Sequence, residues 1–152
     1  MGKKFQGVVD HYLFVGNPGT GKTTVARIMG NIFYSLGVLP SNRLLEVTRK
    51  DLVEGYVGQT ATKTARVVKR AVGGVFFIDE AYSLMGDNFG QEATNTILPM
   101  LLDYKGKMVC IAAGYPREIR QWIDTNSGLE SRFTKVIHFE DIIPMNWRKF
   151  LG

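Results

Sequence analysis

A glycine-rich stretch followed by a lysine and two threonines occupies residues 16–24, with the sequence G-N-P-G-T-G-K-T-T. It fits the pattern G-x-x-x-x-G-K-[ST], with Gly16, Gly21, Lys22 and Thr23 at the defining positions. Glycine allows backbone N–H groups to wrap closely around a chain of phosphates. A helix that begins at about Gly21 would aim its free N–H groups at the same phosphates. The stretch therefore predicts a polyphosphate-binding loop.

The polar side chains of this loop predict a metal-assisted nucleotide site. Lys22 is expected to reach the β- and γ-phosphates, and the Thr23 hydroxyl is expected to ligate Mg²⁺. A glycine turn without a ligand would have no need of a Lys-Thr pair at the helix start. We expect every residue of the stretch to contact the nucleotide: Gly16, Asn17, Pro18, Gly19, Thr20, Gly21, Lys22, Thr23 and Thr24.

Two adjacent acids follow an apolar run further along the chain. Residues 75–78 read V-F-F-I, and Asp79 and Glu80 come directly after them. In a nucleotide-binding α/β domain, Asp79 is expected to hold Mg²⁺ through a bound water. Glu80 is expected to polarise the attacking water as a general base. The alternative for the pair is a solvated strand end, but the glycine loop upstream favours the catalytic interpretation. A signalling GTPase is not expected to carry this Asp-Glu pair.

The elements that must position these residues alternate between short apolar strands and helices. Strands are predicted at about 11–15, 44–48, 75–78, 108–113 and 135–139, and helices at about 21–36, 61–72, 89–104 and 116–124. Residues 51–60 and 128–133 are predicted to be loops. Pro99 lies inside the third helix, so a kink or a break is expected near residues 95–99. The alternation predicts an α/β fold with a mainly parallel five-stranded sheet, whose ligands lie beyond the C-terminal strand ends.

Composition limits the remaining classes of function. The 152 residues suit one domain, and 45% hydrophobic with 22% charged residues is ordinary for a soluble protein. The single Cys110 excludes an internal disulfide, and with only two histidines a Cys/His zinc site is not expected. No stretch reaches transmembrane length or resembles a signal peptide, so a cytoplasmic protein without a membrane partner is expected. The net charge of +5 permits nucleic acid, but the basic cluster is interpreted as a solvated helix face: Lys63, Arg66, Lys69 and Arg70.

Taken together, the motifs resemble the AAA+ ATPases. The loop G-N-P-G-T-G-K-T-T, the strand F-F-I-D-E-A-Y and the segment A-A-G-Y are similar to that family. V-T-R-K-D-L-V-E-G-Y-V-G and T-N-S-G-L-E-S-R-F are similar to one branch of it, which holds CbbX-type rubisco activases, the sporulation stage V protein K and EccA-type ATPases of type VII secretion. The resemblance covers about residues 11–139.

The resemblance implies a P-loop NTPase fold, a three-layer αβα sandwich, in the large subdomain of an AAA+ protein without the helical lid that usually follows. It implies an ATP- and Mg²⁺-dependent hydrolase that works as a ring, usually a hexamer, and remodels a protein substrate. By position, Arg132 resembles the arginine finger that completes a neighbouring subunit's site. Tyr56 and Val57 resemble the pore loop that grips the substrate. Tyr115 stands where most of the family carry a polar sensor residue, often Asn.

Two other functions stay open from the sequence. One is an AAA+ ATPase that acts on nucleic acid, a function that the net positive charge permits. Tyr56 in an aromatic–hydrophobic loop favours a polypeptide instead, so nucleic acid is not the expected partner. The other is a nucleotide-responsive assembly module with little turnover. From the residues alone, Arg132 could equally be a surface arginine, and Tyr56 could simply anchor a turn between glycines.

Overall fold

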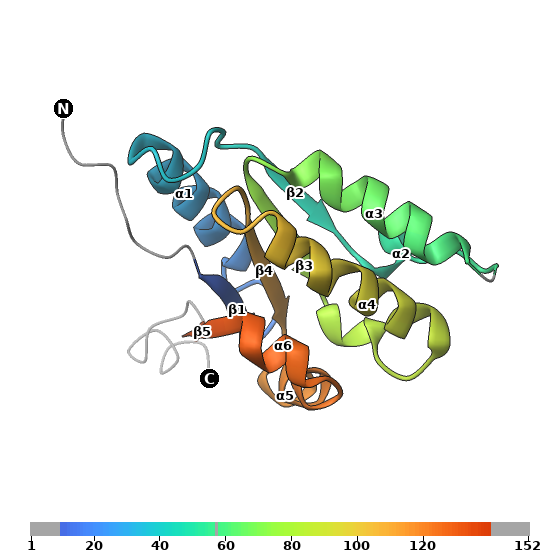
Figure 1. The fold of residues 1–152 in the computed structure, drawn as a ribbon. Coiled ribbons are helices and arrows are strands. Elements are labelled where there is room, and N and C mark those ends of the chain that lie inside the picture. The colour runs from blue at the N-terminus through green and yellow to red at the C-terminus, as the bar shows by residue number, and fades with distance from the viewer. Residues whose placement is uncertain (1–9, 57, 141–152) are drawn as a thin grey trace, which may run out of the picture.

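The computed structural model describes residues 10–56 and 58–140, and these form a five-stranded sheet in the order β2-β3-β4-β1-β5 (Figure 1). The strands are β1 (His11–Val15), β2 (Leu44–Val47), β3 (Val75–Asp79), β4 (Val109–Gly114) and β5 (Phe133–His138). Each neighbouring pair is parallel. The predicted five-stranded parallel sheet is therefore confirmed.

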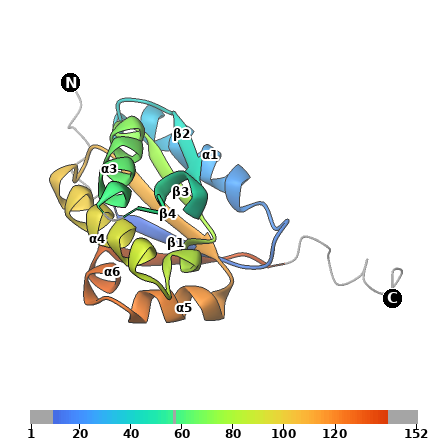
Figure 2. The same cartoon turned by 90° about the vertical axis from the view of Figure 1, so that its right-hand side faces the viewer.

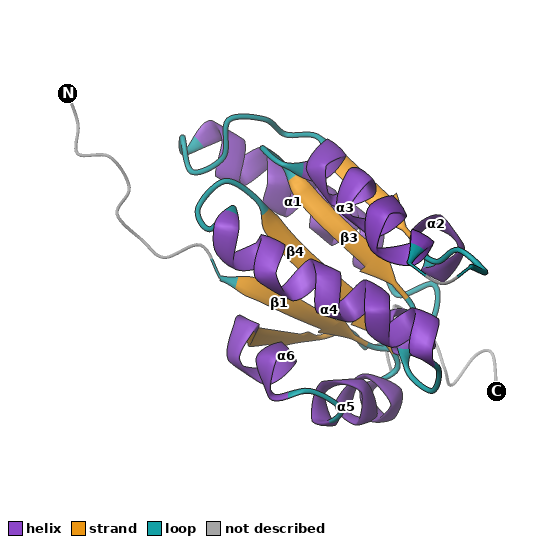
Figure 3. Ribbon diagram, turned by 45° about the vertical axis from the view of Figure 1, so that its right-hand side comes forward, coloured by secondary structure: helices purple, strands orange, loops and turns teal. Residues whose placement is uncertain are grey.

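Helices cover both faces of this sheet. They are α1 (Lys22–Ser35), α2 (Arg49–Leu52), α3 (Gln59–Ala71), the short 3-10 helix η1 (Ala81–Leu84), α4 (Asn88–Asp103), α5 (Pro116–Asp124) and α6 (Ser127–Arg132). Figure 2 shows α1 and α3 on opposite sides of the sheet. Figure 3 shows α3 and α4 side by side over one face. The result is the three-layer arrangement that the sequence predicts.

Strand β3 is apolar from Val75 to Ile78 because this part of it is buried on both faces. Phe76 and Ile78 belong to the core beneath α3 and α4, whereas Val75 and Phe77 belong to the core beneath α1. Side chains alternate between the faces of a strand, so a strand covered on both sides needs apolar residues at every position. Asp79 ends the strand at the edge where the covering helices no longer exclude water.

Of the kink or break predicted near residues 95–99, the break does not occur: α4 runs without interruption from Asn88 to Asp103. Pro99 itself lies on the exposed side of the helix, while Ile97, Met100 and Leu101 are buried around it. Apolar packing on both sides of the proline offsets the one backbone hydrogen bond that it cannot donate.

Two segments predicted to be loops overlap short helices. In the first, Thr48 and Asp51 form a capping box that begins α2, with the Thr48 N–H donating to Asp51 Oδ2 at 2.9 Å. In the second, the Asn126 side chain accepts from the Gly128 N–H at 2.8 Å and begins α6. Both caps are short-range signals that the apolar periodicity does not reveal.

Candidate nucleotide-binding site

The predicted phosphate loop and the paired acids meet at one edge of the sheet. Gly16 follows β1, Asp79 ends β3 and Gly114 ends β4, and the carboxyl ends of these parallel strands face the same side. A cavity of about 310 Å³ lies there. Its lining is Gly16, Pro18, Gly19, Gly21, Lys22, Thr23, Thr24, Phe77, Asp79, Glu80, Tyr82, Gly114 and Tyr115.

The glycines of the loop serve two different purposes. Gly19 and Gly21 adopt φ values of 75° and 89°, a conformation that other residues rarely take, and this turns the backbone around the cavity. Gly16 is needed for another reason. A Cβ atom there would lie 2.6 Å from the Phe139 carbonyl oxygen, so glycine allows the chain after β5 to pass close to the loop.

Lys22 is folded back into its own loop. Its Nζ donates to the Gly16 carbonyl at 2.6 Å and to the Asn17 carbonyl at 3.1 Å. Burial lowers the pKa of Lys22, and the negative charges of Asp79 and Glu80 partly oppose that shift. The ammonium group therefore sits in a partly desolvated place where additional negative charge would be favourable.

The threonines of the loop have separate roles. Thr20 is buried, and its hydroxyl donates to the Asn17 carbonyl at 2.7 Å, so it braces the loop. Thr20 and Asn17 do not line the cavity as described, although both were predicted to contact the nucleotide. The Thr23 hydroxyl donates to Glu46 Oε2 on β2 at 3.5 Å. The sequence analysis did not predict Glu46 at this site. The one feature that could have indicated it is an acidic residue within an otherwise apolar strand.

The acidic pair occupies an unusual piece of backbone. Glu80 has a φ of 52°, and it is the one non-glycine residue with a positive φ in the described part of the chain. Its N–H donates to Asp79 Oδ1 at 3.0 Å, and its carbonyl accepts from the Ser83 N–H at 2.9 Å and the Ser83 hydroxyl at 2.7 Å. Such strain persists only where its surroundings enforce it, and it often marks functional positions. The Glu80 side chain itself is exposed toward the cavity.

The donor set suits a Mg²⁺ ion that a nucleotide brings with it. Within residues 10–56 and 58–140, no group of three or more His, Cys, Asp or Glu side chains could hold a metal without other ligands. Mg²⁺ commonly takes one or two protein oxygens and completes its shell with phosphates and water. Thr23 and Asp79, which line the same cavity, fit that pattern.

Two tyrosines form the far wall of the cavity. The rings of Tyr82 and Tyr115 lie 6.4 Å apart, centroid to centroid, and both line the cavity. A Cβ atom on Gly114 would approach Tyr82 Cδ1 to 2.9 Å, so the glycine makes room for that ring. Burial raises the pKa of Tyr82, and the nearby Glu80 adds to the shift, which keeps the phenol neutral. Tyr115 was predicted at this site, whereas Tyr82 was missed.

Arg132 lies away from this cavity. It ends α6 immediately before Phe133, which pairs with His11 at the start of β1, whereas Gly16 follows the end of β1. A five-residue strand spans roughly 15 Å, so Arg132 and the loop are at opposite edges of the sheet. The Arg132 Nη1 donates to the Ser131 hydroxyl at 3.0 Å, and its buried Nε has no hydrogen-bond partner among the described residues.

Tyr56 is presented to solvent in the connection between α2 and α3. Its side chain is 69% exposed, the largest value among the exposed apolar and aromatic side chains described. The Tyr56 carbonyl accepts from the Gln59 N–H at 3.2 Å and closes a turn. Val57, predicted with Tyr56 to contact a substrate, lies outside the described residues.

Comparisons with known proteins agree with the geometry. Residues 12–141 match the family described as "ATPase family associated with various cellular activities (AAA)". The ESX-1 secretion system protein EccA1 of Mycobacterium tuberculosis is 46% identical over 140 residues, which is 88% of this chain and 24% of that protein. Stage V sporulation protein K of Bacillus subtilis is 47% identical over 134 residues, 86% of this chain and 42% of that protein.

A third relative is the chloroplastic ribulose bisphosphate carboxylase/oxygenase activase of Cyanidioschyzon merolae, 46% identical over 138 residues, 88% of this chain and 47% of that protein. The chain thus spans less than half the length of these relatives. Among solved structures, a mutant of Thermotoga maritima RuvB shares the fold, with a TM-score of 0.60 and 22% identity over 87% of this chain and 38% of that one. No helix in the described residues is long and apolar enough to cross a membrane.

Proposed function

The chain belongs to the AAA family of ATPases, and from that premise we propose that it binds ATP with Mg²⁺ at residues 16–24 and hydrolyses it to ADP and phosphate. The observation that carries the proposal is the meeting of the glycine loop, Asp79 and Glu80 around one cavity. We further propose that the ATPase works as one subunit of a hexameric ring, and that this ring remodels a protein partner.

In the proposed reaction, the loop amides and the N-terminus of α1 hold the phosphates. Lys22 would exchange its two carbonyl partners for phosphate oxygens, a move that the partly desolvated ammonium favours. Mg²⁺, when bound by Thr23 and through water by Asp79, supplies positive charge beside the phosphates. Glu80 accepts a proton from the water that attacks the γ-phosphorus, and the bond from that phosphorus to the leaving ADP oxygen breaks.

Arg132 is proposed to act on the site of a neighbouring subunit. Its place at the opposite edge of the sheet keeps it from its own cavity. The Arg132 side chain is only partly buried, so it can be reached by a group from outside the subunit. An arginine supplied in trans can contribute about 10³–10⁵ in rate to phosphoryl transfer. The function of the site would then require assembly.

A polypeptide is the proposed substrate of the ring. Tyr56 supports this because an aromatic side chain exposed on a turn can pack against many kinds of side chain. The relatives include proteins named for secretion, for sporulation and for rubisco activation. Because the chain covers less than half of each of them, we propose no individual substrate.

A binding titration tests the nucleotide assignment. A fluorescent ATP analogue with Mg²⁺ is titrated into the parent chain, the Lys22→Ala variant and a Lys69→Ala control. The control removes the same charge from an exposed position of α3. We expect Lys22→Ala to abolish binding without changing the unfolding temperature, whereas Lys69→Ala binds as the parent does. Unchanged affinity in Lys22→Ala would exclude this loop as the phosphate site.

A further inference from the structure

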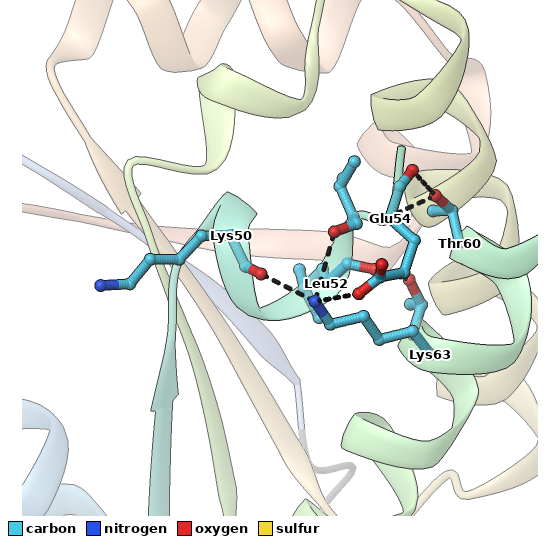
Figure 4. Close-up of polar contacts among 7 residues, drawn as sticks. Lys50, Leu52, Glu54, Thr60 and Lys63 are labelled. Carbon is cyan, nitrogen blue, oxygen red and sulfur yellow. Dashed lines mark hydrogen bonds and ion pairs between the residues drawn. The ribbon is translucent and has the colours of Figure 1, made fainter. Parts of the chain in front are cut away.

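Lys63 does not behave as a member of a solvated basic face. Arg66, Lys69 and Arg70 are exposed on α3 as predicted, but Lys63 is turned toward the end of α2 and is only partly accessible. Its Nζ donates to the Lys50 carbonyl at 3.0 Å, to the Val53 carbonyl at 3.3 Å and to Glu54 Oε1 at 2.9 Å (Figure 4). One ammonium group therefore ties three points of residues 50–54 to α3.

Two threonines on the same helix hold the same segment. The Thr60 hydroxyl donates to the Glu54 carbonyl at 2.9 Å and accepts from the Glu54 N–H at 3.0 Å, so it satisfies both backbone groups of one residue (Figure 4). The Thr64 hydroxyl donates to the Leu52 carbonyl at 2.8 Å. Both threonines are fully buried, so neither hydroxyl has water as an alternative partner.

These bonds satisfy the end of a helix too short to stabilise itself. α2 has four residues, and the last carbonyls of any helix lack partners within it. Its first residue is fixed as well, because Arg49 donates to the Ser83 carbonyl at 2.7 Å and pairs with Asp87. α3 in turn is joined to α4, since the Ala61 N–H donates to Glu92 Oε2 at 2.7 Å. The segment is therefore bonded to the body of the domain.

The described residues that follow this bonded segment, residues 50–54, are exposed to solvent by contrast. Gly55, Tyr56 and Gly58 are all exposed. Gly58 has a φ of 81°, which turns the chain into α3. An exposed aromatic side chain on such a rigid base is suited to bearing a mechanical load.

We propose that Lys63, Thr60 and Thr64 are positioning residues for Tyr56. They hold residues 50–54 on α3, so that a load on the aromatic ring passes into α3 and α4 instead of unravelling the connection. The purpose of this clamp rests on the proposed function of Tyr56, but the order that it imposes on the segment does not.

Amide hydrogen exchange of residues 53–60 tests the clamp. The comparison pairs Lys63→Met with Lys69→Met, and Thr60→Val with Thr62→Val; each control makes the same chemical change at an exposed position of α3. We expect exchange in residues 53–60 to become roughly tenfold faster or more in the two clamp variants, because each loses bonds that close the segment. Exchange in β3 and β4 stays at the parent rate.

A second readout reports the order of residue 56 directly. A fluorophore is attached to the Tyr56→Cys variant; Cys110 is fully buried and burial raises its thiol pKa, so labelling is confined to position 56. Lys63→Met should lower the anisotropy of the fluorophore while Lys69→Met leaves it unchanged. A purely structural role of Lys63 would lower the unfolding temperature without moving this signal.

Equal exchange and equal anisotropy in the clamp and control variants would overturn the proposal. If Lys63→Met fails to fold, Thr60→Val decides, since it removes the hydroxyl and keeps the shape. The test is separate from that of the proposed function. If the clamp variants loosen the segment and a ring without Tyr56 still remodels protein, the clamp stands and the substrate role falls.

Discussion

Gly16 and Phe139 lie so close that a methyl group on Gly16 would come within 2.6 Å of the Phe139 carbonyl oxygen. The contact is between the first residue of the glycine loop and the residue after β5. Phe139 cannot easily move away, because its N–H donates to the Val15 carbonyl at 2.8 Å and its ring packs on Phe14 at 4.9 Å. The end of the sheet therefore sets where the loop begins.

We expect Gly16→Ala to destabilise the domain by about 1–3 kcal/mol, the usual cost of forcing extra atoms into a packed site. The matched control is Gly55→Ala, where an added Cβ would meet no atom within 4 Å and φ is not positive. Urea unfolding of both variants measures the difference. A Gly16→Ala protein as stable as Gly55→Ala would show that β5 does not constrain the loop.

We expect the stability of the folded domain to depend on pH because of His11. It is buried at the start of β1, where its Nδ1 accepts from the Cys110 N–H at 2.9 Å, and only the neutral ring can accept there. Burial lowers the pKa of His11 from 6.5 to about 4; Asp10 opposes the shift and Arg132 adds to it. The unfolded chain thus binds this proton more readily than the folded one, so His11 should destabilise the fold as pH falls from about 6.5 to about 4.

Over that window the loss of stability should be on the order of 3 kcal/mol. Unfolding free energies at pH 7 and pH 4 are compared for the parent, His11→Gln and, as a control, His138→Gln at an exposed position of β5. His11→Gln should flatten the pH dependence, and His138→Gln should keep it. An unchanged slope in His11→Gln would assign the acid sensitivity to other groups.

Tyr56→Ala should leave ATP hydrolysis by an assembled ring largely intact and uncouple it from work on a polypeptide. The reason is that Tyr56 lies outside the cavity, while its carbonyl accepts from the Gln59 N–H at the start of α3. The measurement is release of phosphate alongside unfolding of a reporter protein that carries an unstructured tail. Tyr34→Ala is the control, because that tyrosine is also exposed but lies on α1. Equal remodelling by both variants and the parent would leave Tyr56 as a simple turn residue.

Arg132→Ala and Lys22→Ala should each inactivate a ring of identical subunits, yet recover some activity when mixed. In a mixed ring, an intact loop of one subunit can meet an intact Arg132 of its neighbour. Arg120→Ala, which removes an exposed arginine of α5, is the control and should stay active on its own. No recovery in rings shown to contain both inactive subunits would mean that Arg132 does not act across an interface.

Much of the fold and the core of the candidate site could be predicted from the sequence because both depend on local patterns. The spacing in residues 16–24 and the apolar run before Asp79 define a loop and a strand, and parallel strands bring their ends to one edge. The contacts between distant residues could not be predicted in this way. Glu46 beside Thr23, Tyr82 in the cavity wall and the Lys63 bonds depend on how elements pack. The continuous α4 likewise shows tertiary packing overriding the local effect of Pro99.

The most direct test of ATP hydrolysis at this site is the phosphate release of Glu80→Gln beside its ATP affinity. Glutamine keeps the shape of the exposed side chain but cannot take a proton from water, and a general base contributes about 10²–10⁴ in rate. In an active assembly, we expect ATP affinity close to that of the parent and phosphate release at least about a hundredfold slower, whereas the exposed Glu130→Gln control keeps both. Parent-level phosphate release by Glu80→Gln would contradict the assignment of Glu80 as the base and, with it, the proposed mechanism.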